Sequence, residues 1–163
     1  MEGKPFSSLI ETTIRSFKRA DLNSIEKIEQ RSFTDPWSSS DFESFHQRDG
    51  VRFFVAVRNT HIVGYIIVEV LEATDLLNLR IIKRGHLLNL AVDPKYRRQS
   101  VGKTLVNASL RSLLKERVQE IWLEVRASNW VAKRFYLTMG FREAGRKYQY
   151  YVNEDALIMK REL

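Results

Sequence analysis

The chain reads LNLAVDPKYRRQSVGKT from residue 88 to residue 104, and this stretch decides the fold class. Its first residues belong to an apolar strand predicted at 85–92, which ends at Asp93 and Pro94 because proline cannot donate to a sheet. A basic loop follows and enters a helix predicted from about Val101 to Arg117. Apolar residues at helical spacing give this helix its buried stripe, which comprises Val106, Leu110, Leu113 and Leu114. The order strand, basic loop, helix is typical of an α/β protein.

The loop between this strand and this helix has the features of a phosphate site. The first turn of a helix carries unpaired N–H groups and the positive end of the helix dipole, so it attracts anions. Gly102 lets the backbone come close to a ligand, and basic side chains surround the turn at Lys95, Arg97, Arg98 and Lys103. The segment matches neither a P-loop nor the three-glycine dinucleotide motif. On these residues alone, an ordinary basic loop that caps a helix remains the alternative.

The patterns before this unit predict an antiparallel first half. The expected elements are, in order, a strand at 12–17, a helix capped by Asp21 with an apolar stripe of Ile25, Ile28 and Phe33, a helix from Asp41 to His46, and a hairpin of strands at 52–57 and 61–71. The connection at 72–84 has no pattern that assigns it a form.

The patterns after this unit predict a parallel crossover followed by an antiparallel pair. The expected elements are a strand at 120–126, a short helix that begins at its cap Asn129 and ends at Met139 before Gly140, and strands at 141–151 and 156–161. Strand–helix–strand units of this spacing cross over in parallel and right-handed. The sequence therefore predicts an α/β fold: a mixed central sheet with an antiparallel N-terminal half, parallel fourth and fifth strands, and helices on both faces.

Length and composition limit the classes of protein to consider. The 163 residues fit a single domain over 1–163, with 1–10 as a loose leader. The absence of cysteine excludes a disulfide framework, a thiolate nucleophile and a cysteine zinc site. No signal peptide or membrane-length apolar run is visible, so we expect a cytoplasmic protein without a membrane partner. The net charge of +7 comes without any nucleic-acid-binding signature, so nucleic acid is not the expected ligand.

Three segments resemble one known family. The residues RRQSVG at 97–102 resemble the Q/R-x-x-G-x-G/A motif of the GCN5-related N-acetyltransferases, the GNAT superfamily. IWLEVRASN at 121–129 and FYLTMGF at 135–141 resemble the branch that acetylates protein N-termini, which includes the RimI-type ribosomal-protein alanine acetyltransferases and the archaeal N-terminal acetyltransferases. The resemblance covers roughly residues 12–163 and implies the GNAT fold with acetyl-CoA as cosubstrate.

The resemblance also assigns the cofactor-binding residues. The backbone of Leu90, Ala91 and Val92 would hold the pantetheine arm and polarise the thioester carbonyl. The pyrophosphate would lie on the loop made of Arg97, Arg98, Gln99, Ser100, Val101, Gly102 and Lys103. Ser100 departs from the motif, which has glycine there. If this position requires a positive φ, serine costs about 1 kcal/mol, although its hydroxyl could donate to a phosphate oxygen.

Glu124 is the main catalytic candidate. It lies on the opposite face of its strand from Ile121, Leu123 and Val125, and a carboxylate there needs a partner or a cleft. The resemblance implies that Glu124 is the general base, whereas the pattern alone also fits a surface glutamate paired with an arginine. A protein α-amine has a pKa near ~8, so a single carboxylate, acting through a water, can take its remaining proton. A lysine amine near ~10.4 demands a stronger base, which favours N-terminal substrates.

Three further residues complete the expected site chemistry. By resemblance, Asn129 contacts CoA and Tyr136 both binds the cofactor and protonates the departing thiolate; a packed core aromatic is the alternative for Tyr136. His86 at the start of its strand is a candidate second base or water ligand, although a lone histidine is more often structural. Two ligands, His86 and Glu124, do not make a convincing metal site, so no metal is predicted.

The substrate-binding residues follow from the resemblance as well. The C-terminal hairpin would lie over the substrate peptide, so that Tyr150 and Tyr151 hydrogen-bond its backbone. Phe33, Pro36 and Trp37 would form the opposite wall and select the first side chain. On pattern alone, these tyrosines are also consistent with aromatic residues at a sheet edge.

The sequence predicts an acetyl-CoA-dependent enzyme that acetylates the α-amine of protein N-termini, with ribosomal proteins among the candidate substrates and the ribosome as a candidate partner. Two alternatives remain open. One is an acetyltransferase for small amines or lysine, and the other is a non-catalytic CoA-binding module associated with the ribosome.

Overall fold

The computed structural model describes residues 11–163, so the leader predicted at 1–10 lies outside the described residues. The strands are β1 (Thr13–Ser16), β2 (Val51–Arg58), β3 (His61–Asp75), β4 (Arg80–Val92), β5 (Val118–Arg126), β6 (Arg142–Tyr151) and β7 (Glu154–Glu162). The α-helices are α1 (Leu22–Ser32), α2 (Ser39–His46), α3 (Val101–Lys115) and α4 (Trp130–Thr138), and short 3-10 turns lie at Arg19–Asp21 and Pro94–Tyr96. Within this part of the chain, no helix combines the length and apolar character needed to cross a bilayer.

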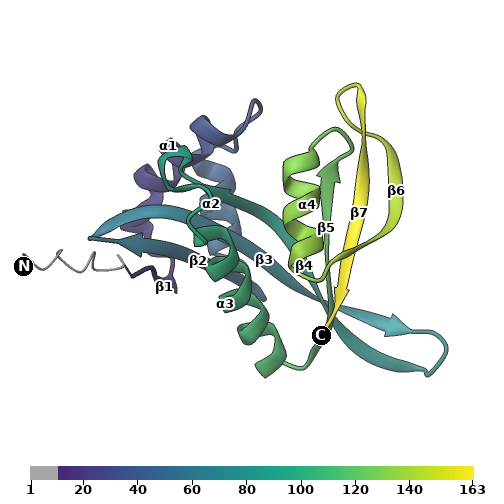
Figure 1. Ribbon diagram of the computed structural model, residues 1–163. Coiled ribbons are helices and arrows are strands. Elements are labelled where there is room, and N and C mark those ends of the chain that lie inside the picture. The colour runs from purple at the N-terminus through teal and green to yellow at the C-terminus, as the bar shows by residue number, and fades with distance from the viewer. Residues whose placement is uncertain (1–10) are drawn as a thin grey trace, which may run out of the picture.

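The strands form one seven-stranded sheet in the order β1-β2-β3-β4-β5-β7-β6. Neighbouring strands are antiparallel except β4 and β5, which are parallel and are joined by the crossover through α3. Figure 1 shows α1 and α2 gathered near β1 and β2, and α4 beside β5 at the other end of the sheet. The predicted fold class, with its antiparallel first half and parallel fourth and fifth strands, is therefore confirmed.

Two hydrophobic cores lie on the two faces of the sheet, and β3 contributes to both. Because side chains alternate along a strand, Tyr65 and Ile67 enter the core beneath α1 and α2, whereas Ile66 and Val68 enter the core beneath α3. All four side chains have no exposed surface. A strand covered on both faces reads as a continuous apolar run, which is the pattern of this segment.

The pairing of β4 with β5 is short, and its end creates the site. Within residues 11–163, the recorded pairs run from Lys83 and Val118 to His86 and Trp122. Beyond that point β4 continues to Val92 along β3, while β5 continues along β7. The two parallel strands therefore separate at the point where their sequences carry the predicted functional residues.

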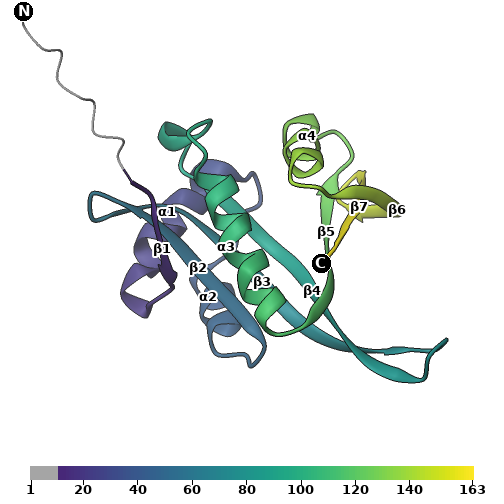
Figure 2. The ribbon, with the colours of Figure 1, turned by 60° about the horizontal axis from the view of Figure 1, so that its bottom comes forward.

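The connection at 72–84, for which no sequence pattern predicted a structure, is the outer part of a long hairpin. β3 and β4 stay paired as far as Asp75 and Arg80, and the Asp75 carboxylate accepts the Leu77 N–H at 3.1 Å to close the turn. Figures 1 and 2 show this arm projecting away from the body of the molecule. The apolar pattern fails here because neither face of the arm is covered, and Leu77 is 94% exposed. The strand predicted at 85–92 therefore begins earlier, at Arg80.

The predicted side-chain cap of the first helix is wrong. A 3-10 turn precedes α1 and holds Asp21 at φ −83° and ψ −14°, a helical conformation from which its carboxylate does not cap α1. That carboxylate instead accepts the Lys18 N–H at 2.8 Å and pairs with the Arg15 guanidinium at 2.6 Å. Asp21 thus fastens β1 to the start of the helical segment.

Two residues assigned to apolar stripes lie outside the cores. Phe33 follows the last residue of α1 in an extended conformation and is 41% exposed. Leu114 is 53% exposed, and the fully buried Leu105 takes a core position in α3 that the predicted stripe left out. Both errors come from extending a helical period to an element's end, where the chain turns away from the core.

Candidate active site

A cleft of about 830 Å³ lies where β4 and β5 separate, between the loop before α3 and the helix α4. Most of the predicted cofactor residues line it, namely Leu90, Val92, Arg97, Arg98, Ser100, Val101, Gly102, Lys103, Asn129 and Tyr136. Two others are turned elsewhere. Ala91 is buried in the core on the opposite face, and the Gln99 side chain accepts from Arg58 at 2.6 Å and donates to the Lys95 carbonyl at 3.1 Å.

Ser100 adopts the left-handed conformation that the family motif provides for with glycine. Its φ is 64° and its ψ is 5°, and Arg98 two residues earlier also has a positive φ of 59°. The Ser100 carbonyl accepts the Thr104 N–H at 2.9 Å, but its side chain makes no cap bond to α3. The first turn of α3 therefore presents its N–H groups to the cleft without a side-chain cap, as an anion site requires.

The loop is held against its neighbours by polar contacts. The Arg97 Nε donates to the Val92 carbonyl at 3.1 Å, and its Nη2 donates to Ser32 Oγ at 3.1 Å. Asp93 accepts the Lys95 N–H at 2.9 Å and pairs with Arg31 at 3.0 Å. These contacts give Arg97 a structural role in shaping the loop as well as its positive charge.

Glu124 and His86 meet beside the end of the β4–β5 pairing. His86 Nε2 lies 2.6 Å from Glu124 Oε2, and the Glu124 side chain is only 6% exposed. The His86 ring stacks on Trp122 with ring centres 4.6 Å apart and planes within 9° of parallel. This stacking fixes the imidazole so that its Nε2 faces the carboxylate. Trp122 is therefore a supporting residue of the site, a role that the sequence analysis did not assign to it.

Lys147 is the second partner of Glu124, and the sequence analysis missed it. Its Nζ donates to Glu124 Oε1 at 2.6 Å. Burial acts to raise the pKa of Glu124, but the hydrogen bonds from His86 and Lys147 outweigh it and lower the pKa to about 2. The same contact raises the pKa of Lys147. The pair is therefore an ionised carboxylate and an ammonium at neutral pH.

Tyr136 and Asn129 reach the cleft from the two ends of α4. Tyr136 is 8% exposed, and its ring packs edge-on against Phe135 and Phe141. Burial, with a smaller effect of Tyr151, raises the pKa of Tyr136 well above its usual value of 10, so the phenol stays protonated. The Asn129 side-chain oxygen Oδ1 accepts the Ala132 N–H at 3.0 Å, which confirms Asn129 as the cap of α4.

The tyrosines of the C-terminal hairpin lie beside Glu124. The Tyr151 hydroxyl donates a long bond of 3.5 Å to the Glu124 carbonyl oxygen, and the Arg126 guanidinium lies 4.2 Å from the centre of the Tyr151 ring. Burial and the neighbouring Tyr150 raise the pKa of Tyr151 to about 12. Tyr150 is half exposed and contacts Tyr151 edge-on, which leaves it the more accessible of the two.

The three residues before α2 that were predicted to contact the substrate, Phe33, Pro36 and Trp37, do not lie in one place. Phe33 lines the cleft, and Pro36 is exposed. The Trp37 ring stacks on Phe45 with centres 4.9 Å apart and packs against the core beneath α1 and α2. The Trp37 N–H donates to the buried Glu29 carboxylate at 2.9 Å, which anchors this segment to α1.

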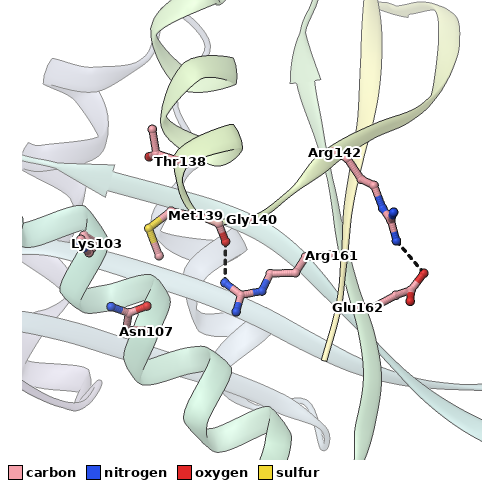
Figure 3. Close-up of a pocket in the computed structure, with 8 residues that line it drawn as sticks. All are labelled: Lys103, Asn107, Thr138, Met139, Gly140, Arg142, Arg161 and Glu162. Carbon is pink, nitrogen blue, oxygen red and sulfur yellow. Dashed lines mark hydrogen bonds and ion pairs between the residues drawn. The ribbon is translucent and has the colours of Figure 1, made fainter.

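A second cleft of about 500 Å³ adjoins the first and shares Lys103, Thr138 and Met139 with it. Figure 3 shows that its other side carries two arginines from the C-terminal strands. Arg161 donates to the Met139 carbonyl at 2.5 Å, and Arg142 pairs with Glu162 at 3.0 Å. The positive surface that begins at the loop thus continues past Lys103, which the sequence did not reveal because these arginines lie far along the chain.

Comparisons with known proteins identify the family of the chain. The family model described as the acetyltransferase (GNAT) family matches residues 22–141. The [ribosomal protein bS18]-alanine N-acetyltransferase of Escherichia coli strain K12 is 36% identical over 151 residues, which cover 90% of this chain and 95% of that protein. The N-alpha-acetyltransferase of Saccharolobus solfataricus is 31% identical over 157 residues, which cover 93% of each chain.

A solved structure extends the similarity to three dimensions. The crystal structure of the ribosomal-protein-S18-alanine N-acetyltransferase from Escherichia coli matches with a TM-score of 0.80 and 35% identity, covering 93% of this chain and 94% of the other. The resemblance seen in the loop at 97–102 and in the strand before Asn129 is therefore confirmed over almost the whole length of both proteins. The chain belongs to the acetyltransferase (GNAT) family.

Proposed function

We propose that this protein transfers the acetyl group of acetyl-CoA to the α-amine of a protein N-terminus. The observation that carries the proposal is the ionised Glu124, held by His86 at the point where β4 and β5 separate. The names of the Escherichia coli and Saccharolobus solfataricus relatives support the same acceptor.

The cleft suits acetyl-CoA in three respects. The uncapped first turn of α3 and the basic side chains of Arg98 and Lys103 fit a pyrophosphate. Leu90 and Val92 line the cleft on the part of β4 that runs on past its pairing with β5, so their peptide groups suit a pantetheine arm. Bound acetyl-CoA would supply a thioester whose carbonyl carbon accepts the amine.

The residues of the chain would divide the proton transfers between them. Glu124 is ionised at neutral pH and accepts the proton released by the attacking amine, directly or through a water. Tyr136 keeps its proton and donates it to the departing thiolate. Peptide N–H groups at Leu90 to Val92 polarise the thioester carbonyl. Asn129 would contact CoA, and Tyr150 and Tyr151 would hold the peptide backbone opposite Phe33, Pro36 and Trp37.

The acceptor defines the cellular setting of the proposal. A ribosomal protein is the first substrate to test, because the Escherichia coli relative is named for one. We place the reaction in the cytoplasm, where newly made N-termini and acetyl-CoA meet, with the ribosome as a partner to be tested. Neither a membrane nor nucleic acid is required.

The deciding experiment measures CoA release with peptides that differ only in their amines. Peptides with a free α-amine should be acetylated, whereas the same peptides blocked at the α-amine but carrying a lysine should not. Turnover of the lysine peptides alone would support the small-amine or lysine alternative. Glu124→Gln should lower kcat by about 10²–10⁴-fold while CoA still binds. Activity unchanged by that substitution would support the non-catalytic alternative.

A further inference from the structure

Both carboxylate oxygens of Glu124 already have partners. His86 Nε2 lies 2.6 Å from Oε2, and Lys147 Nζ donates to Oε1 at 2.6 Å. The carboxylate itself is buried, with 6% of the side chain exposed. An α-ammonium that binds Glu124 directly therefore competes with these two donors for a buried carboxylate.

His86 is poorly placed to leave. It lies on β4 at the last recorded pair with β5, and its side chain is 19% exposed. Its ring is stacked on Trp122. Moving its ring away from Glu124 would break this stacking.

Lys147 is well placed to leave. Its side chain is 44% exposed and ends a flexible chain of four carbons on β6, which is an edge strand of the sheet. Its Nζ also lies 4.9 Å from the centre of the Tyr150 ring, a favourable place for an ammonium outside the ion pair. Lys147 can therefore release Glu124 without disturbing the packing of the core.

The backbone of β6 shows why Lys147 reaches Glu124 at all. The strand β7 lies between β5 and β6, and the small buried Ala156 pairs with Lys147 on one side and with Arg126 on the other. Immediately after Lys147 the register with β7 shifts, and Gln149 has a positive φ of 48°. Such bulges re-aim side chains at strand edges. The long side chain of Lys147 therefore spans β7 to reach the carboxylate.

We infer that the ammonium of Lys147 occupies the place that the α-ammonium of the substrate takes, and that an incoming N-terminus displaces it from Glu124. The inference rests on the proposed function. The exchange leaves the charge around Glu124 unchanged, because one ammonium replaces another. A blocked N-terminus is neutral and cannot compete for the carboxylate. Lys147 thus sets the affinity of the site for the α-ammonium of a substrate.

The test compares Lys147→Met, which removes the ammonium, with Lys147→Arg, which keeps the charge. The matched control is Arg146→Met on the same strand, where the guanidinium pairs with Asp155 at 3.1 Å, away from Glu124. Calorimetry would titrate an alanine-initiated peptide with a free α-amine into each CoA-loaded enzyme, which binds the peptide without turnover. Steady-state kinetics with acetyl-CoA would then give the peptide KM and kcat of each protein.

Lys147→Met should bind the peptide roughly three- to tenfold more tightly and lower its KM to match, as expected for removing one half-exposed ion pair. The affinity of the same variant for the N-formyl counterpart should change less, because that peptide has no ammonium to compete for Glu124. Lys147→Arg and Arg146→Met should resemble the wild type. Unchanged or weaker peptide binding by Lys147→Met would overturn the displacement. Tighter peptide binding by that variant without acetylation by any of the proteins would overturn the proposed function alone.

Discussion

At position 136 a tyrosine is buried in an aromatic cluster and also faces the cleft, so packing and catalysis make different demands on the same side chain. Packing needs only the ring, whereas proton donation needs the hydroxyl group. The raised pKa of Tyr136 keeps its hydroxyl group protonated at neutral pH, so a proton is present when the thiolate forms beside it. A substitution that removes the oxygen alone separates the two roles.

Tyr136→Phe should keep the fold and the affinity for acetyl-CoA, while kcat for peptide acetylation falls by about 10²-fold or more. The reason is that the thiolate then leaves without a proton donor. The rate of CoA release measures kcat, and calorimetry measures the affinity for acetyl-CoA. A kcat near that of the wild type would remove Tyr136 from the chemistry and leave it a packing residue.

Ser100 is strained at its positive φ of 64°, and glycine would relieve that strain. Ser100→Gly should raise the free energy of unfolding by up to about 1 kcal/mol, the cost of the left-handed conformation less the added freedom of the unfolded chain. Affinity for acetyl-CoA should stay the same or improve. Urea denaturation and calorimetry are the measurements, and a large loss of affinity would show that the hydroxyl itself holds a phosphate.

At the scale of elements, leucines differ in their exposure to solvent. The leucines on the outer hairpin of β3 and β4 are exposed, whereas most of those on the helix α3 are buried. Leu77 is 94% exposed on the arm, whereas Leu105 has no exposed surface. Leu105→Ala should cost about 2–5 kcal/mol of unfolding free energy because it leaves a cavity, while Leu77→Ala should stay within about 0.5 kcal/mol. Thermal or urea denaturation of both variants tests this. A large loss for Leu77→Ala would mean that the arm packs against another surface in solution.

The same contrast explains how far the sequence predicted the elements. Strands with one or two covered faces, such as β2, β5 and β7, were found because burial imposes a period on their residues. The arm at 72–84 was not predicted because nothing covers it, and the prediction of a cap at Asp21 was wrong because a 3-10 turn changes the local geometry.

In the candidate site, Glu124 and His86 lie on regular strands and were among the predicted residues. Lys147 was missed because a bulge and a neighbouring small residue direct it across β7, and neither has a sequence period.

At the scale of the whole molecule, the buried ion pairs tie stability to pH. Glu124 has a pKa of about 2 in the folded protein and an ordinary value of 4.5. A lowered pKa stabilises the folded state above the unfolded value, and that stabilisation is lost as the pH falls from about 4.5 towards 2. The wild type should therefore lose its stability advantage over Glu124→Gln across this range. Urea denaturation at several pH values between 6 and 3 measures the difference, and a difference independent of pH would contradict the assignment.

The short ladder between β4 and β5 has a mechanical consequence. Within residues 11–163, four residue pairs between β4 and β5 join the part of the sheet made by β1 to β4 to the part made by β5, β7 and β6, and one hydrophobic core contains residues of both parts. The backbone pairing between the two parts of the sheet is therefore short, and the cleft lies where that pairing ends. A ligand in the cleft would contact β4 and the loop before α3 on one side and α4 on the other, so it would bridge the two parts. Bound cofactor would therefore restrict the motion of one part of the sheet relative to the other. Without it, the enzyme would open first where β4 and β5 separate.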